Sequence, residues 1–381
     1  MARPDPVPDR DDVACWCVIA GGGTGGHVIP GLAVARALVE RGHAPGSIRF
    51  LGSARGPDIE LVGAAGFAIT ALPGRGIQRR LTLANVSAAV ALVRGIWRGA
   101  REIRRRRPAV VLSLGGYASV AGTVGAVIAR VPLVVTEQNA RASLANRLAG
   151  RFAVASAVPV DGTDLPRAVV TGNPVRPEVV AAASRSQADA RAELGVPADR
   201  TLVVAMSGSL GSRRVNQAVI GAVERLAARG DLAVRHVIGR RDWRSEHAPE
   251  PRLGPDPAIW YEAVEYEHRS DLLLAAADVF VGRSGGTVAE LTVVGVPAVL
   301  VPLPGAPADH QTANAAALVA AGAARLLADA DCDGDRLAAV LTDIVDEPGR
   351  LDAMAAASRR LGRPDAAARV AELLEEHARR G

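Results

Sequence analysis

A run of glycines between a buried strand and an amphipathic helix restricts the fold of this chain more than any other feature. The strand is predicted over Val13–Ala20, the glycine run occupies Gly21–His27, and the helix behind it ends at Gly42. Because glycine lacks a Cβ, several backbone N–H groups of such a run can reach one anion, and the helix N-terminus adds about half a positive charge. The stretch therefore predicts a binding site for a phosphate or a diphosphate.

The same residues satisfy the dinucleotide-binding pattern Gly21-x-Gly23-x-x-Gly26, a pattern that is weak by itself. Dinucleotide-binding folds also carry an acidic residue at the end of the next strand, where it holds a ribose. The next strand here, Ile48–Leu51, is followed by no carboxylate before Asp58. A dinucleotide-dependent oxidoreductase is therefore disfavoured and stays as an alternative.

The composition excludes several classes of chemistry. All 45 side chains counted as lysine or arginine are arginine, which excludes Schiff-base catalysis and lysine-dependent phosphate loops. The net charge of +5 is modest and no nucleic-acid motif is present, so no nucleic-acid partner is expected. Cys15, Cys17 and Cys332 form neither a disulfide framework nor a metal-ligand cluster, and we expect the first two to be core residues on one side of a strand.

Strand and helix signals alternate along the chain, stop at the prolines of Asn173–Pro177 and then restart. Such alternation predicts an α/β fold with two Rossmann-like parallel-sheet domains facing across a cleft. The predicted division is a disordered N-terminal tail at 1–12, a first domain at 13–172, a hinge and linker at 173–198, a second domain at 199–345 and C-terminal helices at 346–381. The last helical segment, 363–379, is expected to pack back onto the first domain.

Short apolar runs bounded by glycine and proline predict the strands of both sheets. Those of the first domain are 13–20, 48–51, 68–71, 109–112, 133–135 and 168–170. Those of the second domain are 201–206, 234–238, 260–264, 279–281 and 298–301. The longest predicted helix covers 84–106. Residues 109–129 are uncharged over the length of a membrane span, but glycines, serines and a threonine interrupt them, so a strand, a loop and a helix are predicted there.

Two loops behind predicted strands of the second domain suit a phosphate. In residues 206–212, the hydroxyl of Ser209 adds a donor to the backbone N–H groups, and an ordinary tight turn is the alternative. In residues 282–287, Arg283 can neutralise a diphosphate. The two loops together predict a nucleotide diphosphate site.

Other polar residues near strand ends suit sugar hydroxyls. Glu290 can accept two hydrogen bonds from a ribose, although a first-turn carboxylate stabilised by the helix dipole is the alternative. Gln311 offers a donor and an acceptor to a sugar, and helix capping by Asp309 is the alternative at that position. In the first domain, the loops 114–117 and 137–139 are expected to face the same cleft as the glycine run.

Together these segments resemble the MurG family, the bacterial N-acetylglucosaminyltransferases that make lipid II and have the GT-B fold. The shared segments, in chain order over about residues 13–330, read GGGTGGHVIPGLAVA, LSLGGYASVAG, TEQNARASLANR, GNPVR, SGSLGS, GRSGGTVAEL and DHQTANA. The resemblance implies inverting transfer of N-acetylglucosamine from UDP-N-acetylglucosamine to the 4-hydroxyl of the N-acetylmuramoyl unit of lipid I, the undecaprenyl-diphosphate-linked acceptor, for peptidoglycan synthesis. It also implies a peripheral position on the cytoplasmic face of the bacterial cell membrane.

The alternatives to this function are a related GT-B glycosyltransferase with another lipid or natural-product acceptor, and a non-catalytic nucleotide-sugar-binding protein. The resemblance assigns residues to two ligands. For UDP-N-acetylglucosamine they are Thr24, Gly25, Gly26, Asn139, Arg176, Ser209, Arg283, Glu290 and Gln311. For the acceptor diphosphate they are Gly23, Thr24, Gly25, His27, Gly116 and Tyr117.

His27 is the candidate general base. An unperturbed pKa of about 6.5 suits neutral pH, and a helix N-terminus disfavours the charged imidazolium. The alternative is that His27 only donates to a phosphate and orients the loop. No loop carries the paired carboxylates that would hold Mg²⁺ against UDP, so neither a metal nor another cofactor is expected. The charge of the leaving diphosphate is expected to fall to Arg283, the Ser209 loop and helix dipoles.

Three positions depart from the family pattern. The loop Gly285–Val288 is one residue shorter than usual, Glu267 stands where an aliphatic residue commonly lies next to the uracil, and Thr136 replaces a frequent histidine. None of them removes a proposed catalytic group, but they leave room for an altered substrate.

A basic and apolar stretch is the candidate membrane contact. Gly74–Leu83 mixes apolar residues with Arg79 and Arg80, a composition that can bind anionic lipid. For the segment that follows, up to Arg107, the alternative is a helix packed on its own sheet with solvated arginines.

Overall fold

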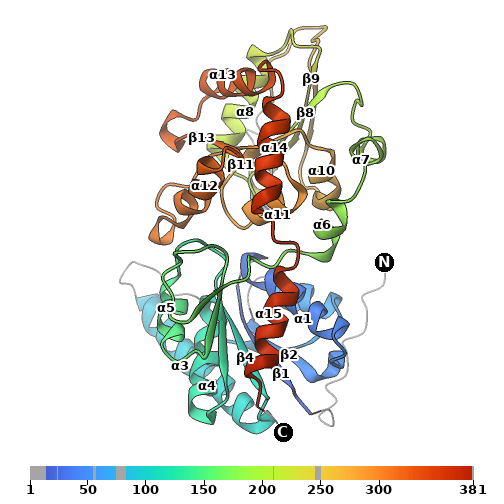
Figure 1. Ribbon diagram of the computed structural model, residues 1–381. Helices are drawn as coiled ribbons and strands as arrows, with labels where there is room; N and C mark the ends of the chain where they lie inside the picture. Colours follow the sequence, from blue (N-terminus) through green and yellow to red (C-terminus); the bar gives the residue numbers. More distant parts are fainter. Residues whose placement is uncertain are drawn as a thin grey trace. The chain divides into compact units, whose positions relative to one another are not determined.

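The computed structural model describes residues 14–23, 25–54, 57–73, 83–208, 210–244 and 250–379, with the backbone alone for 83–92. The chain divides into two compact units (Figure 1). Unit 1 comprises Met1–Arg176 and Pro364–Gly381, and unit 2 comprises Pro177–Arg363. Each unit is a parallel sheet with helices on both faces, so the predicted α/β class with two Rossmann-like sheets is confirmed.

The described part of unit 1 holds a seven-stranded sheet in the order β3-β2-β1-β4-β5-β6-β7. All its pairs are parallel. The strands are β1 (Cys17–Gly22), β2 (Ile48–Ser53), β3 (Ala68–Leu72), β4 (Val110–Gly115), β5 (Leu133–Thr136), β6 (Ala155–Val158) and β7 (Ala168–Val170). The strand order reverses between β1 and β4, and in such sheets ligands bind beyond the carboxyl ends of the strands at this reversal.

The helices of unit 1 cover both faces of this sheet. They are α1 (Gly25–Glu40), α2 (Asp58–Ala64), α3 (Leu83–Arg106), α4 (Gly116–Ala129), α5 (Leu144–Gly150) and α15 (Ala366–His377), with a short 3₁₀ helix at Pro45–Ser47. Apolar residues of α1 and α15 form one core with one face of the strands. Those of α3, α4 and α5 form a second core on the other face.

Cys15 and Cys17 are both buried, as predicted, but not on one side of a strand. Cys17 belongs to the core under α1 and α15, and Cys15 belongs to the core under α3 and α4. The alternation rule fails here because β1 begins only at Cys17 and Cys15 precedes it.

The described part of unit 2 holds a six-stranded parallel sheet in the order β10-β9-β8-β11-β12-β13. Its strands are β8 (Thr201–Met206), β9 (Leu232–Val237), β10 (Trp260–Val264), β11 (Val279–Gly282), β12 (Ala298–Leu300) and β13 (Ala324–Leu326). The order reverses between β8 and β11, so the loops behind these two strands lie at the position where a ligand is expected.

Helices also cover both faces of the second sheet. They are α6 (Pro177–Ala182), α7 (Gln187–Leu194), α8 (Arg213–Arg225), α9 (Arg240–Trp243), α10 (Ser270–Ala276), α11 (Thr287–Val294), α12 (His310–Ala320), α13 (Gly334–Val345) and α14 (Arg350–Leu361), with 3₁₀ helices at Pro307–Asp309 and Asp329–Asp331. Helices α8 and α13 pack on one face, and α7, α10, α11 and α12 pack on the other.

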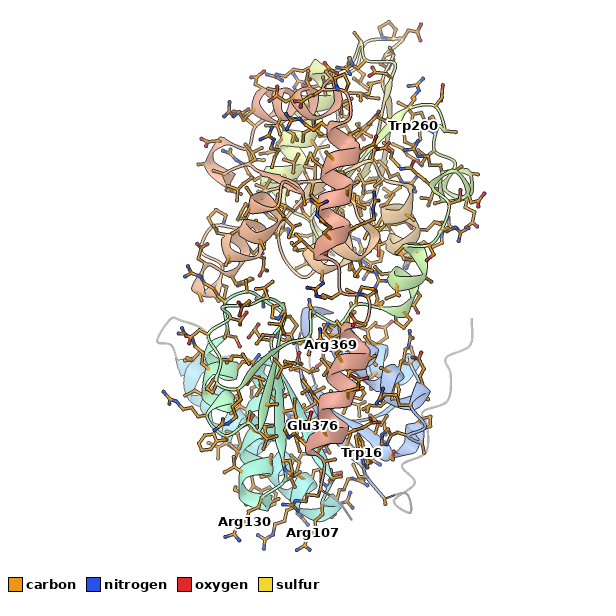
Figure 2. The ribbon with its side chains drawn as sticks, in the orientation of Figure 1. Trp16, Arg107, Arg130, Trp260, Arg369 and Glu376 are labelled. Atoms are coloured by element: carbon orange, nitrogen blue, oxygen red, sulfur yellow. The ribbon has the colours of Figure 1, made fainter. Side chains whose placement is uncertain are left out.

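The last two helices belong to different units, α14 to unit 2 and α15 to unit 1. Helix α15 lies beside α1, and Figure 2 shows Trp16 near it. Val370 and Leu374 are fully buried there. At the margin, Arg41 pairs with Glu372 and Glu375 at 3.2 and 2.6 Å. Because exposed ion pairs contribute little, the apolar contacts carry most of this attachment.

Every predicted strand is present, and two further strands of the described residues, β6 and β13, were not predicted. β6 (ASAV) consists of small residues, and β13 (ARL) exposes two of its three side chains, so neither shows the apolar run that predicts a strand. β1 begins four residues later than predicted, at Cys17. At its other end it continues through Gly21 and Gly22, which are both buried. The longest predicted helix is present as α3, and no helix in the described ranges is long and apolar enough to cross a membrane.

Candidate functional site

In unit 1 the glycines bring two strand ends into close contact at the reversal point. Gly22, the last residue of β1, forms an isolated parallel bridge with Gly116, which follows β4. A Cβ on Gly116 would lie 2.8 Å from the carbonyl oxygen of Gly22, and one on Gly21 would lie 2.5 Å from the Cβ of Leu114. These glycines are therefore required by the approach of two backbones, independently of any ligand.

A buried carboxylate is bound to the glycine turn. Asp58, the first residue of α2, is fully buried. The N–H of Gly23 donates to both of its carboxylate oxygens at 2.9 Å, and the N–H of Ser53 donates to Oδ2 at 2.8 Å. One N–H that the sequence assigned to a phosphate is thus bound to an anion of the chain itself.

His27 lies in the first turn of α1, against Gly115 and Gly116 at the end of β4. A Cβ on Gly115 would lie 3.4 Å from His27 Nε2, and one on Gly116 would lie 3.5 Å from its Cε1. Burial lowers the pKa of His27, and the nearby charges of Glu137 and Asp58 partly oppose this shift. The imidazole is therefore neutral at pH 7, which is the state a general base requires.

Glu137 organises the loop behind β5. Its carboxylate is 1% exposed and accepts five hydrogen bonds. Oε1 accepts from the N–H groups of Gln138 and Asn139 and from Asn139 Nδ2, at 3.0 to 3.1 Å. Oε2 accepts from Ser143 N and Asn146 Nδ2, both at 2.9 Å. The predicted site residue Asn139 is therefore held by a carboxylate that the sequence analysis did not single out.

Asn146 brings a second polar side chain close to Gly115. Its Oδ1 is buried and has no hydrogen-bond partner among the described residues. A Cβ on Gly115 would lie 3.4 Å both from this oxygen and from His27 Nε2. The same Cβ would lie 3.2 Å from Asn146 Nδ2, so any residue larger than glycine at this position would crowd both Asn146 and His27.

The remaining predicted residues of unit 1 are placed differently. Gly25 and Gly26 form the N-terminus of α1, and Gly23 has a φ of +93°. Tyr117 donates its hydroxyl to the carbonyl of Pro73, so that group is engaged with the end of β3. Burial raises the Tyr117 pKa. Arg176 is half-buried at the end of unit 1, and Thr24 lies outside the described residues.

In unit 2 a partly buried arginine joins the loops. The guanidinium of Arg283, behind β11, donates to Ser212 Oγ from Nε and Nη2 at 3.2 and 2.8 Å. Its Nη1 donates to the carbonyls of Val301 and Pro302 at 3.1 and 3.0 Å. The same Nη1 lies 2.6 Å from Asp329 Oδ1, a close ion pair rather than an aligned hydrogen bond. Arg283 therefore joins the segments behind β8, β11, β12 and β13.

The two other predicted residues lie at the same edge. The side-chain oxygen of Gln311, Oε1, accepts a hydrogen bond from the N–H of Leu303 at 2.9 Å. The backbone carbonyl of Gln311 accepts one from the hydroxyl of Ser284 at 2.8 Å. Glu290 is half-buried in α11. Asp309 does not cap α12 through a backbone N–H, since its carboxylate accepts the Thr312 hydroxyl instead.

Ser209 and Glu267 were both singled out from the sequence. Ser209 lies outside the described residues. Glu267 is turned away from solvent: Oε1 accepts the N–H of Arg269 at 2.9 Å and Oε2 lies 3.3 Å from the guanidinium of Arg235. The side chain of Glu267 thus braces the end of β10 against β9. In the described ranges, no group of three or more His, Cys, Asp or Glu residues is arranged to hold a metal ion.

The sequence analysis missed the residues that shape the loops. The partners of Asp58 and Ser212 are distant in sequence, 35 and 71 residues away, whereas Glu137 and Asn146 bind each other within one segment. For Glu137 and Asn146 a signal existed, because both belong to the polar segment TEQNARASLANR. Asp58 carried no such signal, since an acidic residue in the first turn of a helix is common.

Comparison with family models identifies both halves of the chain. Residues 17–158 match the glycosyltransferase family 28 N-terminal domain, and residues 202–370 match the glycosyltransferase family 28 C-terminal domain.

Individual relatives span nearly the whole chain. A protein from Moorella thermoacetica, named UDP-N-acetylglucosamine--N-acetylmuramyl-(pentapeptide) pyrophosphoryl-undecaprenol N-acetylglucosamine transferase, is 36% identical over 366 residues, covering 94% of this chain and 97% of its own. A protein of the same name from Alkalilimnicola ehrlichii is 40% identical over 369 residues, covering 95% and 99%. The crystal structure of Acinetobacter baumannii MurG has a TM-score of 0.73 at 24% identity, covers 95% of this chain and 99% of that one, and shows the shared fold.

Proposed function

Because the chain belongs to glycosyltransferase family 28, we propose that it transfers N-acetylglucosamine from UDP-N-acetylglucosamine to the N-acetylmuramoyl unit of an undecaprenyl-diphosphate-linked acceptor, with inversion at the anomeric carbon. The observation that carries the proposal is the identity of 36 to 40% over about 95% of the chain to proteins that bear this activity in their names. The polar loops at the reversal points of both sheets are consistent with it, because transfer needs one site for a nucleotide and one for an acceptor.

In this proposal His27 is the general base. The acceptor 4-hydroxyl oxygen attacks the anomeric carbon, the bond from that carbon to the diphosphate oxygen breaks, and UDP leaves with the electron pair. The proton of the attacking hydroxyl passes to His27 Nε2, which burial keeps neutral. If His27 only binds a phosphate, its loss weakens acceptor binding and spares turnover.

The diphosphate of UDP is assigned to unit 2. Arg283 binds carbonyl and hydroxyl oxygens and so takes up no backbone N–H group of the loops it joins. The N–H of Leu303 is bound to Gln311, and those loop N–H groups that have no such partner can meet an anion. We propose that these N–H groups and the helix dipoles behind them, with Glu290 and Gln311 on the sugars, bind the nucleotide without a metal ion. The roles of Thr24, Gly25, Gly26, Asn139, Arg176 and Ser209 in donor binding, and of Gly116 and Tyr117 in acceptor binding, belong to the same proposal.

Helix α3 is the proposed membrane contact among the described residues. Val93 and Trp97 are 65% and 64% exposed, and the arginines around them, Arg94, Arg98 and Arg101, are exposed too. Arg101 lies over the Trp97 ring at 5.4 Å. Such an apolar and basic face can bind anionic lipid, which supports the proposed peripheral position on the cytoplasmic face of the membrane. Most of the predicted loop Gly74–Leu83, with Arg79 and Arg80, lies outside the described residues.

The test is a pairwise transfer assay with purified protein. Labelled UDP-N-acetylglucosamine with lipid I is compared with UDP-glucose and diacylglycerol, and both donors are also incubated without acceptor. The proposal expects UDP release and a disaccharide product only with the first pair. Activity with the second pair alone would assign another acceptor, as the short Gly285–Val288 loop and Glu267 leave open, and nucleotide-sugar binding without turnover would indicate a binding protein.

A further inference from the structure

We infer that Asp58 is a positioning residue, whose carboxylate holds the Gly21–Gly23 turn in the shape that lets His27 and the first turn of α1 meet the acceptor. The inference rests on the proposed function, since it concerns the acceptor side of that reaction. It also makes a claim about the resting protein that can be measured without catalysis.

The hydrogen bonds of the Asp58 carboxylate tie two strand ends together, and we call this arrangement the Asp58 clamp. Asp58 accepts from Gly23 at the end of β1 and from Ser53 at the end of β2, so one carboxylate joins two neighbouring strand ends. Space around it is restricted: a Cβ on Gly22 would lie 1.8 Å from Oδ2, and one on Gly52 would lie 3.1 Å from it. A neutral amide of the same size offers one acceptor oxygen instead of two, so it cannot reproduce the paired bond to Gly23.

The clamp changes how the glycine turn binds an anion. With the Gly23 N–H directed inward to Asp58, the acceptor diphosphate is left with N–H groups from the start of α1. The carboxylate also adds a negative charge on the inner side of the turn. The charged groups that act on His27 are this carboxylate, on α2, and that of Glu137, behind β5, and both raise the His27 pKa against the effect of burial. Asp58 therefore affects both the shape and the proton affinity of the site.

Asp58→Asn tests the inference by steady-state kinetics with both substrates. We expect the KM for lipid I to rise about tenfold while the KM for UDP-N-acetylglucosamine changes by less than about twofold, because the clamp shapes the acceptor side only. The acidic limb of the pH profile is expected to move to lower pH by about half a unit, because removing a negative charge lowers the pKa of His27. Asp58→Glu retains the charge, so the limb should stay in place.

A second measurement does not depend on turnover. The pKa of His27 is followed by NMR titration, with the resonance assigned by its loss in His27→Gln. A lower pKa in Asp58→Asn and an unchanged one in Asp58→Glu support the inference even if no transfer is found with lipid I, so failure of the proposed function and failure of the inference are distinguishable.

The matched control is Asp278→Asn in unit 2. Asp278 also accepts hydrogen bonds from a backbone N–H, that of Leu202, and from an arginine, Arg191, but it lies directly before the start of β11, at the opposite end of the strand from Arg283. It should lose stability without changing the lipid I KM or the His27 pKa. If Asp58→Asn does not fold, Gly52→Ala in an Ile69→Val background replaces it. Ile69→Val removes the Cδ1 atom that the added methyl would meet at 2.6 Å, and the methyl then lies 3.1 Å from Oδ2 of an intact Asp58. Relative to Ile69→Val alone, it should raise the lipid I KM about threefold. An Asp58→Asn enzyme that loses only thermal stability, with an unchanged lipid I KM and His27 pKa, would overturn the inference.

Discussion

The loops of the two units are organised by groups of opposite charge. In unit 1 two buried carboxylates, Asp58 and Glu137, accept backbone N–H groups at the ends of β1, β2 and β5. In unit 2 the guanidinium of Arg283 donates to the backbone carbonyls behind β12 and to Ser212. A carboxylate consumes the donors that an anionic ligand needs, whereas an arginine consumes acceptors and leaves the donors available. We therefore expect the loop of unit 1 to bind an anion more weakly than the loops of unit 2.

The comparison accounts for how the two diphosphates are divided between the units. A nucleotide that is bound and released needs the loop N–H groups that Arg283 leaves available. In unit 1 the proposed base is a neutral imidazole, and the negative carboxylates beside it would support the proton that His27 receives in the proposed reaction. The carboxylate-organised loop suits proton transfer, and the arginine-organised loop suits binding of the nucleotide.

The largest expected effect comes from removing His27. His27→Ala should lower turnover at least about a hundredfold, because a positioned base contributes that much, while the affinity for UDP changes little. Single-turnover rates with saturating lipid I, together with UDP binding by calorimetry, check both parts. A turnover close to that of the unmodified enzyme would remove His27 from the chemistry and leave unit 1 as a binding unit only.

Removing Arg283 should weaken the proposed nucleotide site in unit 2. Arg283→Met keeps the bulk of the side chain but releases Ser212, two carbonyls and Asp329, so the loops lose their common anchor. The KM for UDP-N-acetylglucosamine is expected to rise about thirtyfold with little change for lipid I. Arg214→Met is the control, because Arg214 is exposed and donates only to the carbonyls of Asp329 and Ala330. Equal losses in the two variants would mean that Arg283 has no special role in the loops.

A neutral polar centre in unit 2 gives a pH-dependent prediction. Asn216 donates to Asp242 and to the carbonyl of Ile238, so its oxygen accepts His236 Nε2–H, and His236 Nδ1 accepts the hydroxyl of Tyr261. Burial lowers the pKa of His236 to about 3. Below pH of about 6.5 the unfolded chain binds a proton that the folded chain does not, so stability is complete above that pH and falls as the pH decreases towards 3.

The expected slope is up to about 1.4 kcal/mol of unfolding free energy per pH unit from this one group. Urea unfolding of the native enzyme and of His236→Gln between pH 7 and 5 measures it. The variant is less stable throughout, but its stability should depend less steeply on pH. Parallel curves for the two proteins would show that His236 is protonated in the folded state.

The smallest effect is expected at the membrane. Trp97→Ala should weaken binding to anionic vesicles about threefold, because one exposed indole is lost from the basic face of α3. Trp243→Ala, which removes another partly exposed indole from unit 2, is the matched control in the same flotation assay. A comparable loss for Trp243 would assign lipid binding to the protein surface in general and not to α3.

Much of the fold follows from patterns that the sequence displays directly. Apolar runs alternating with amphipathic helices predict both sheets, and the family assignment is confirmed by both family models and by the relatives. The exceptions have local causes. β6 and β13 are short and poor in apolar residues, and β1 begins late enough to separate Cys15 from Cys17.

The candidate site was predictable in position but not in detail. Glycines, His27 and Arg283 are recognisable because such residues are unusual in those places. Their environment is not, since the partner of Gly23 is Asp58, 35 residues away, and Arg283 reaches Ser212, 71 residues away. Whether a loop N–H is free for a ligand or already bound to a carboxylate depends on contacts that only the folded chain makes.

The proposed division assigns the nucleotide to unit 2 and the acceptor to unit 1. Calorimetric binding of UDP to Asp58→Asn, to Arg283→Met and to the unmodified protein tests it most directly. If the donors of unit 2 bind the nucleotide and the clamp of unit 1 serves the acceptor, Asp58→Asn binds UDP with an unchanged Kd and Arg283→Met binds it at least about tenfold more weakly. Weaker UDP binding by Asp58→Asn, with Arg283→Met unaffected, would contradict the account.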